Sequence, residues 1–244
     1  MGILIAFEGI DGSGKATQAS ELFSKLSKQS LKVELLTFPM YQTTFFGHEV
    51  GRYLDGAFGE LRAVHPKLAA LLYAGDRFES RNRILKSINS TDVLICDRFT
   101  GSNQAHHAAK LPLPERKGFT KWIERLECEI FGIPQPNLVI FLDISPEEAV
   151  KLIRQKSTRS YTNRKADIHE ADFGYLTDVA TVYRDLAKKS NWVTVRCVQK
   201  NVLRTIAEIH TDIWTQCCGL CPHIKNESSR VITPEADHSV TKMG

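Results

Sequence analysis

FEGIDGSGKATQ, the stretch Phe7–Gln18, sets the expected fold of this chain. Gly9, Gly14 and Lys15 have the spacing G-x-x-x-x-G-K, which is typical of a phosphate-binding loop. The apolar run Ile3–Phe7 precedes the loop, and a segment with one apolar face at helical spacing follows it. Because the motif requires a strand before it and a helix after it, the surrounding sequence supports this interpretation.

Most of the groups that bind a nucleoside triphosphate are present in this loop. Glycines bring backbone N–H groups close to phosphate oxygens, the following helix adds the partial positive charge of its N-terminus, and Lys15 reaches the β- and γ-phosphates. One position departs from the motif, because Ala16 stands where a hydroxyl usually binds Mg²⁺. Since Mg²⁺ keeps several waters in most protein sites, we expect water to replace that hydroxyl. The predicted ATP-binding residues are Gly9, Ile10, Asp11, Gly12, Ser13, Gly14, Lys15, Ala16 and Thr17.

Further apolar runs predict the other strands, at Leu31–Phe38, Val93–Cys96, Leu138–Leu142 and Trp192–Val198. The runs do not alternate with polar residues, which suits strands that are covered on both faces. Helical patterns lie between them, and one of these predicts a continuous helix over Pro66–Ile88. The chain is therefore expected to form a three-layer α/β fold with a parallel sheet, helices on both faces and ligands at the carboxyl ends of the strands.

The composition is that of an ordinary soluble protein. The 244 residues are 42% hydrophobic and 25% charged, which suits one globular domain, and a net charge of +4 is too small to indicate a nucleic-acid or membrane partner. The chain contains no run of about 18 apolar residues and no signal peptide, so we expect a cytoplasmic protein with reduced cysteines. The last helix, near Val202–Cys217, is expected to close a domain over residues 1–215. Residues 216–244 are expected to form a flexible, cysteine-containing extension.

Charged and polar residues follow the run Val93–Cys96. Asp97 ends this predicted strand, where a carboxylate can hold Mg²⁺ directly or through water, or instead cap a helix or pair with an Arg. The guanidinium groups of Arg77 and Arg98 have the shape to bind a monophosphate, and each is also suited to a surface salt bridge. The polar residues that come next can either read the edge of a pyrimidine or begin a helix. They are Ser102, Asn103 and Gln104.

A basic segment, KLIRQKSTRSYTNRK at Lys151–Lys165, holds six basic and no acidic residues. We interpret residues 151–166 as a lid that closes over the transferred phosphoryl group, with Arg154 and Arg159 as the favoured cations. A solvated basic turn and a nucleic-acid patch are the alternatives. The absence of an aromatic ladder argues against the nucleic-acid patch.

Taken together, several motifs resemble the thymidylate kinase family. They are the loop FEGIDGSGKATQ, LLYAGDRFE at Leu71–Glu79, DRF at Asp97–Phe99 and SNQAH at Ser102–His106, and the likeness extends over roughly Gly2–Thr215. The resemblance implies a P-loop NTPase fold with a five-stranded parallel sheet, usually in a homodimer. It also implies that ATP phosphorylates dTMP to dTDP, with Mg²⁺, in the supply of dTTP for DNA synthesis.

The resemblance further assigns roles within the acceptor site. It implies that Arg77 and Arg98 hold the dTMP phosphate, that Tyr73 stacks on thymine and that Phe38 forms a wall of the base pocket. Asp11 would meet the acceptor sugar or position the reacting phosphates, so that Asp11, Lys15, Arg98, Arg154 and Arg159 form the expected catalytic set.

Two positions depart from the family pattern. Many relatives carry an Arg soon after Phe-Pro, but here Met40 and Tyr41 follow, so Tyr41 offers a hydrogen bond without a charge. Some members place an Arg inside the phosphate loop, but here that position is Gly12, so the lid would have to supply the cation.

Other interpretations remain open. A deoxynucleoside kinase shares the loop and the Asp-Arg pair at a strand end, and a catalytically weak nucleotide-binding regulator would explain Ala16. Near the C-terminus, four residues have a spacing that could bind zinc, although exposed thiols on a loose tail are favoured. They are Cys217, Cys218, Cys221 and His223.

Overall fold

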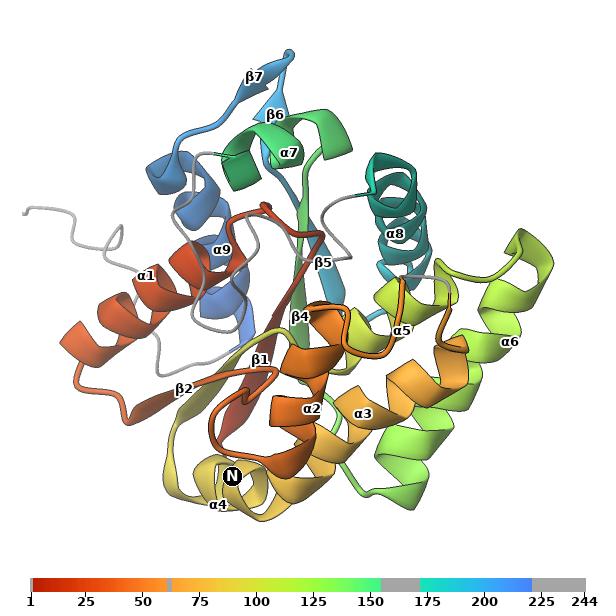
Figure 1. The fold of residues 1–244 in the computed structure, drawn as a ribbon. Helices are drawn as coiled ribbons and strands as arrows, with labels where there is room; N and C mark the ends of the chain where they lie inside the picture. Colours follow the sequence, from red (N-terminus) through yellow and green to blue (C-terminus); the bar gives the residue numbers. More distant parts are fainter. Residues whose placement is uncertain (1, 61–62, 155–171, 221–244) are drawn as a thin grey trace, which may run out of the picture.

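The computed structural model of this chain describes residues 2–60, 63–154 and 172–220. In these residues, β1 (Ile3–Glu8) lies at the centre of a five-stranded sheet with the order β2-β3-β1-β4-β5, in which every pairing is parallel (Figure 1). The other strands are β2 (Val33–Thr37), β3 (Val93–Asp97), β4 (Leu138–Asp143) and β5 (Trp192–Arg196). The predicted α/β fold with a parallel sheet is confirmed.

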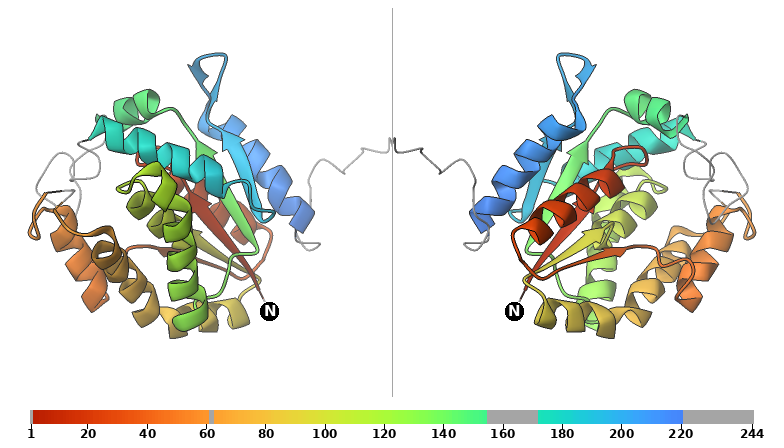
Figure 2. Two further views of the ribbon diagram at one scale, coloured as in Figure 1. Left: turned by 90° about the vertical axis from the view of Figure 1, so that its right-hand side faces the viewer. Right: turned by 90° about the vertical axis from the view of Figure 1, so that its left-hand side faces the viewer.

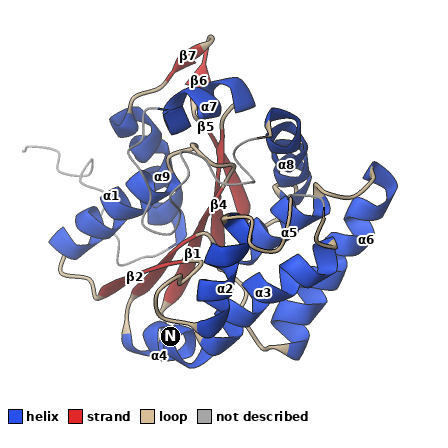
Figure 3. Cartoon of the chain, viewed as in Figure 1, coloured by secondary structure: helices blue, strands red, loops and turns tan. Residues whose placement is uncertain are grey.

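Helices cover both faces of this sheet, as Figure 2 and Figure 3 show. Over one face pack α1 (Lys15–Lys28) and α9 (Ile206–Leu220), and toward the other pack α4 (Arg81–Ser90), α5 (Thr100–Ala108) and α8 (Phe173–Leu186). The remaining elements are α2 (Phe45–Leu54), α3 (Pro66–Glu79), α6 (Leu113–Glu124), the π-helix η1 (Arg125–Ile130), α7 (Pro146–Arg154) and a hairpin of β6 (Val198–Gln199) and β7 (Val202–Leu203). Among the described residues, none of these helices has the length and hydropathy needed to cross a membrane.

The sequence of the central strand explains why the sheet is covered on both sides. Residues 4–7 of β1 are at most 1% exposed, although successive side chains point to opposite faces. Phe7 is aligned with Asp97 on β3 and with Ile140 on β4. The phosphate loop, which leaves the carboxyl end of β1, therefore begins between two other strand ends.

The prediction of one helix over Pro66–Ile88 is wrong, because the chain divides at Ser80 into α3 and α4. The two parts bury different faces: α3 buries Ala70 and Arg77 beside α5, whereas α4 buries Ile84 and Ile88 against the sheet. A single straight helix could not pack both faces, so tertiary packing overrides the local helical pattern.

The C-terminal part of the domain also differs from expectation. The predicted helix begins at Ile206 because Val202 and Leu203 form β7, and α9 continues beyond Thr215 to Leu220. Cys217 is fully buried in the core and Cys218 is partly buried, so these two thiols belong to a packed helix and not to a loose tail. Cys221, His223 and the rest of the predicted extension lie outside the described residues.

Candidate active site

A cleft of about 330 Å³ lies at the carboxyl ends of β1, β2 and β3. It contains residues predicted for both the donor and the acceptor of a phosphoryl group. Its lining includes Asp11, Gly12, Gly14, Lys15 and Ala16 from the loop, Phe38, Tyr41, Asp97 and Arg98 from the strand ends and the segments after them, and Tyr73, Arg77, Ser102 and His106 from α3 and α5. One cavity thus brings together most of the predicted site.

Lys15 is buried at the centre of the phosphate loop. Its Nζ donates to the carbonyl oxygen of Ile10 at 2.7 Å and to Ser13 Oγ at 3.3 Å. Gly14, just before α1, has a left-handed backbone and no side chain that could cap the helix. The first backbone N–H groups of α1 are therefore suited to bind an anion. Burial and the nearby Arg98 lower the pKa of Lys15 to about 7, while Asp11 and Asp97 oppose this shift. A phosphate anion would favour the charged amine.

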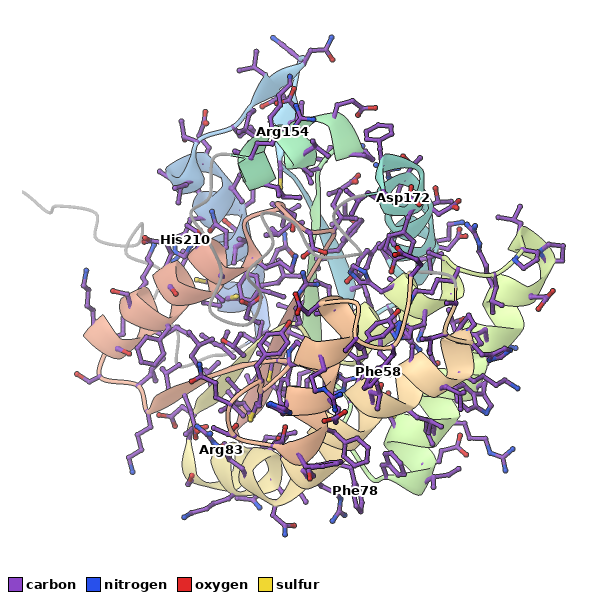
Figure 4. The ribbon with its side chains drawn as sticks, viewed as in Figure 1. Phe58, Phe78, Arg83, Arg154, Asp172 and His210 are labelled. Carbon is purple, nitrogen blue, oxygen red and sulfur yellow. The ribbon has the colours of Figure 1, made fainter. Side chains whose placement is uncertain are left out.

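The loop also contacts the helix that leads into the predicted lid. A Cβ on Gly12 would overlap the carbonyl oxygen of Ala149 on α7. At the other end of α7, Arg154 is exposed and does not line the cleft that the described residues form (Figure 4). Arg159 and most of the predicted lid lie outside the described residues.

Arg98 and Asp97 lie where β3 ends. The backbone of Arg98 is left-handed, with φ 64°, and its N–H donates to the carbonyl oxygen of Phe7 at 3.0 Å. Its guanidinium forms an ion pair with Asp11 and donates to Ser102 Oγ at 3.2 Å. Burial disfavours this charge, but the Asp11 carboxylate together with Tyr183 and Asp97 more than offsets burial, so the pKa of Arg98 is raised. The charged guanidinium thereby links the phosphate loop to Ser102 on α5.

Glu8, a residue that was not predicted from the sequence, contacts Phe99 and Ser102 next to Arg98. It ends β1, is fully buried, and accepts hydrogen bonds from Phe99 N at 2.9 Å, Ser102 Oγ at 2.6 Å and Tyr183 OH at 3.0 Å. Burial raises its pKa, while the bond from Ser102 and the charge of Arg98 act in the opposite direction. The feature of the sequence that could have indicated Glu8 is its place, as an acidic residue at the end of an otherwise apolar strand.

The residues of the SNQAH segment point in different directions because they lie on one helix. Ser102 and His106, one turn apart on α5, line the cleft. Asn103 and Gln104 are not among the residues that line it: Asn103 Nδ2 donates to Glu127, and Gln104 Nε2 donates to the carbonyl oxygen of Thr120 on α6 at 3.0 Å. The structure therefore places Gln104 against α6 and outside the lining of the cleft.

His106 is a cleft residue to which the sequence analysis gave no role. Its Nδ1 lies 3.2 Å from Tyr175 OH, and the same hydroxyl donates to the carbonyl oxygen of His106 at 2.8 Å. Burial lowers the pKa of His106 to about 3, so the imidazole is neutral at physiological pH. Its spacing of four residues from Ser102 was the available signal.

Arg77 is neutralised by an acidic partner. Its Nε and Nη2 donate to the two carboxylate oxygens of Glu127 at 2.5 and 2.8 Å. Burial opposes the charge of Arg77, but Glu127 more than offsets this and raises the pKa of Arg77. The two expected phosphate-binding arginines thus differ, since Arg98 lies beside the phosphate loop and Arg77 is held by a fully buried carboxylate.

Aromatic rings form the wall of the cleft beside Arg77. Phe38 packs edge-to-face against Phe99, with ring centroids 5.9 Å apart. Tyr73 packs in the same way against His107, at 4.9 Å. Both Phe38 and Tyr73 line the cleft, so this end offers apolar and aromatic surface to a ligand.

Sequence comparison identifies the family. The family model described as Thymidylate kinase matches residues 7–211 of this chain. The chain belongs to the thymidylate kinase family. Members of this family are nucleoside monophosphate kinases that phosphorylate dTMP, and this chain is a phosphotransferase of that kind.

Individual thymidylate kinases are similar over most of their length. The enzyme of Mycobacterium tuberculosis is 31% identical over 196 residues, which cover 79% of this chain and 91% of the relative. That of Caenorhabditis elegans is 32% identical over 219 residues, covering 83% and 89%. The solved structure of thymidylate kinase from Candida albicans has the same fold, with a TM-score of 0.68 and 24% identity over 92% of this chain and 94% of that one. These comparisons do not favour a deoxynucleoside kinase or a regulator.

The fold gives a reason for one departure from the thymidylate kinase pattern. Gly12 has a left-handed backbone, with φ 82°, and lies against the backbone of α7. An Arg in its place would be strained and would have to displace that helix. Where some thymidylate kinases have a loop arginine, this chain has a loop closed against α7.

Proposed function

We propose that this chain transfers the γ-phosphoryl group of ATP to dTMP within the described cleft, releasing dTDP and ADP. The observation that supports this most directly is the ion pair between Asp11 of the phosphate loop and Arg98 of the acceptor side. It brings donor-binding and acceptor-binding groups to one place, which is the main requirement of phosphoryl transfer. The phosphate loop and Lys15 would hold the donor phosphates.

The two arginines would have different tasks. Arg98 lies next to the loop, and its side chain stays 20% exposed although it pairs with Asp11, so we assign it to the dTMP phosphate. The charge of Arg77 is compensated by Glu127, so it is better suited to an uncharged part of the acceptor, near Tyr73 and Phe38. This revises the role in phosphate binding that the resemblance implied for Arg77.

The residues present fit Mg²⁺. Asp97 offers a carboxylate in the cleft, and oxygen is the ligand that Mg²⁺ prefers. Ala16 provides no side-chain oxygen, so Asp97 would hold the ion, directly or through water, together with the ATP phosphates. When bound, Mg²⁺ neutralises charge on the β- and γ-phosphates. The role of Arg154 and Arg159 as lid cations stays a prediction.

We also infer a homodimer from the surface of α3. Leu68, Leu71 and Phe78 are exposed and have helical spacing along one side of this helix, and Figure 4 shows Phe78 at the outer surface. The ring of Phe131 lies 4.8 Å from that of Phe78 and extends the patch. A contiguous apolar surface of this kind suits a two-fold contact between identical helices. If this surface forms the dimer, the Leu68→Glu variant should sediment as a monomer in analytical ultracentrifugation.

The cytoplasmic location also stays a prediction.

A panel assay tests the proposed function. ADP release from ATP and Mg²⁺ would be followed with dTMP, dUMP, dGMP, AMP and thymidine as acceptors. We expect dTMP to be preferred, and Lys15→Met to lose activity by about 10²-fold or more because the donor phosphates lose their cation. Lys28→Met, at the exposed end of the same helix, is the matched control and should behave as wild type. Equal rates with every acceptor would refute the specificity, and no turnover of dTMP would refute the function.

A further inference from the structure

The carboxylate of Glu127 joins two residues that were expected to bind the acceptor. Its Oε1 accepts hydrogen bonds from Arg77 Nη2 at 2.8 Å and from Asn103 Nδ2 at 2.7 Å, and its Oε2 accepts one from Arg77 Nε at 2.5 Å. Asn103 Nδ2 also donates to the carbonyl oxygen of Ala70 at 3.1 Å. One side chain on η1 therefore ties together α3, which carries Arg77 and Tyr73, and α5, which carries Ser102 and His106.

This pair is fully removed from water. Glu127 is 0% exposed and Arg77 is 1% exposed. Two parallel hydrogen bonds between a guanidinium and a carboxylate offset the loss of hydration, whereas removal of either partner leaves a buried charge uncompensated. Of the two, only Arg77 is among the described residues that line the cleft. Glu127 can thus act on a ligand only through Arg77.

The wide turn of η1 explains why the inward face of this segment ends at Glu127. Phe131 N donates to the carbonyl oxygen of Leu126, five residues earlier, at 2.9 Å, which is the π-helical pattern. In an α-helix Ile130 would share a face with Ile123, Leu126 and Glu127. Those three are buried, but Ile130 is 64% exposed. The inward face therefore ends at Glu127, in a type of turn that is frequent at functional sites.

We propose that Glu127 is a positioning residue for the acceptor nucleotide. It compensates the charge of Arg77 and fixes the direction of the guanidinium, leaving the N–H groups of Nη1 for an uncharged polar group of the acceptor. Because Glu127 does not line the cleft, its effect reaches the reaction through Arg77. This inference rests on the proposed function, in which the acceptor binds beside Arg77.

Two substitutions and a matched control test this role. Glu127→Gln keeps the size of the side chain but removes its charge, and Glu127→Asp keeps the charge but withdraws the carboxylate by one methylene. Glu129→Gln is the control, on the same π-helix with a side chain 72% exposed. We expect the KM for dTMP to rise about tenfold in Glu127→Gln and less in Glu127→Asp, since hydrogen bonds to charged groups contribute on this scale. The KM for ATP and kcat should stay within about twofold, and Glu129→Gln should match wild type.

A measurement without turnover separates this inference from the proposed function. In ¹⁵N NMR spectra, the Nε–H signal of Arg77 should be sharp and slowly exchanging in wild type and in Glu129→Gln, and lost in both Glu127 variants. If wild type fails to phosphorylate dTMP, the proposed function falls, while this signal still reports the pair. If wild type is active and the folded Glu127 variants keep its KM for dTMP, the positioning role is overturned. Equal rises in KM for ATP and dTMP would overturn it too, and Glu127→Asp alone decides if Glu127→Gln does not fold.

Discussion

Replacing Gly12 by alanine measures how tightly the phosphate loop is packed against α7. Gly12 has φ +82°, and a Cβ there would lie 2.4 Å from the carbonyl oxygen of Ala149 and 3.0 Å from Ile153 Cγ1. A left-handed conformation costs a residue with a Cβ about 1–2 kcal/mol. Carbon and oxygen atoms normally stay more than ~3.2 Å apart, so α7 must shift by nearly ~1 Å, and overpacking of this kind costs about 1–3 kcal/mol. We expect a total destabilisation of about 2–5 kcal/mol.

Two other glycines separate the conformational cost from the steric one. Gly14 has φ +88° but nothing within 4 Å of its added Cβ, so Gly14→Ala should cost only about 1–2 kcal/mol. Gly118, in α6, has open space and an ordinary helical backbone, so Gly118→Ala should stabilise by about 0.5–1 kcal/mol.

The assay is urea and thermal unfolding of the ligand-free proteins. A change of 1 kcal/mol shifts Tm by about 2–4 °C in a chain of this size, so Gly12→Ala should lower Tm by about 4–20 °C and Gly14→Ala by about 2–8 °C. Equal losses in these two variants would refute the contact with α7. A loss in Gly118→Ala would refute the reasoning about open space.

Affinity for ATP should fall as pH rises through about 7, because burial and Arg98 lower the pKa of Lys15 to about 7 and only the protonated amine attracts phosphate. Calorimetry between pH 6 and 9 checks this, and Lys15→Met should remove the dependence. Ala16→Ser should leave ATP affinity within about twofold and lower the Mg²⁺ concentration for half-maximal activity, since the hydroxyl adds a ligand. An unchanged Mg²⁺ requirement in a magnesium titration would contradict this. Lys110→Met should stabilise the protein most below pH 7, because burial lowers the pKa of Lys110 from 10.5 to about 7 and folding must then bury a charge or release a proton. The gain should shrink as pH rises from about 7 toward 10.5, and a gain that is constant between pH 6 and 10 in urea unfolding would exclude this cause.

The parts of the fold that the sequence predicted are those with local signals. The three inner strands, β1, β3 and β4, are runs of neighbouring apolar residues that end in an acidic residue, and the phosphate loop has its strand before it and its helix after it. The cleft at the carboxyl ends of the strands follows from these elements and from the rules of parallel sheets. Asp97 and Arg98 could be placed there because Asp97 ends a strand and Arg98 directly follows it.

The parts that it did not predict depend on distant partners. Glu127 meets Arg77 across 50 residues of sequence, so an acidic residue on η1 could be noticed but its buried partner could not. Nothing near Ser80 in the sequence shows that α3 and α4 will bury different faces. Glu8 is separated from Ser102 by 94 residues, so an acidic residue in an apolar strand could be noticed but its partner could not.

On helix α5, three consecutive residues make contacts with three different parts of the structure, so different requirements constrain each of them. Ser102 faces the cleft and Arg98, Asn103 is bound to Glu127 and α3, and Gln104 is bound to α6. We expect a substitution at Ser102 to affect catalysis and one at Gln104 to affect the packing of α5 against α6. Tolerance to mutation over residues 102–104 should therefore depend on the direction in which each side chain leaves the helix, and not on how near the residue lies in sequence to a cleft residue. A library of single substitutions over residues 102–104, sorted separately for folding and for activity, would show this as two distinct profiles on adjacent residues.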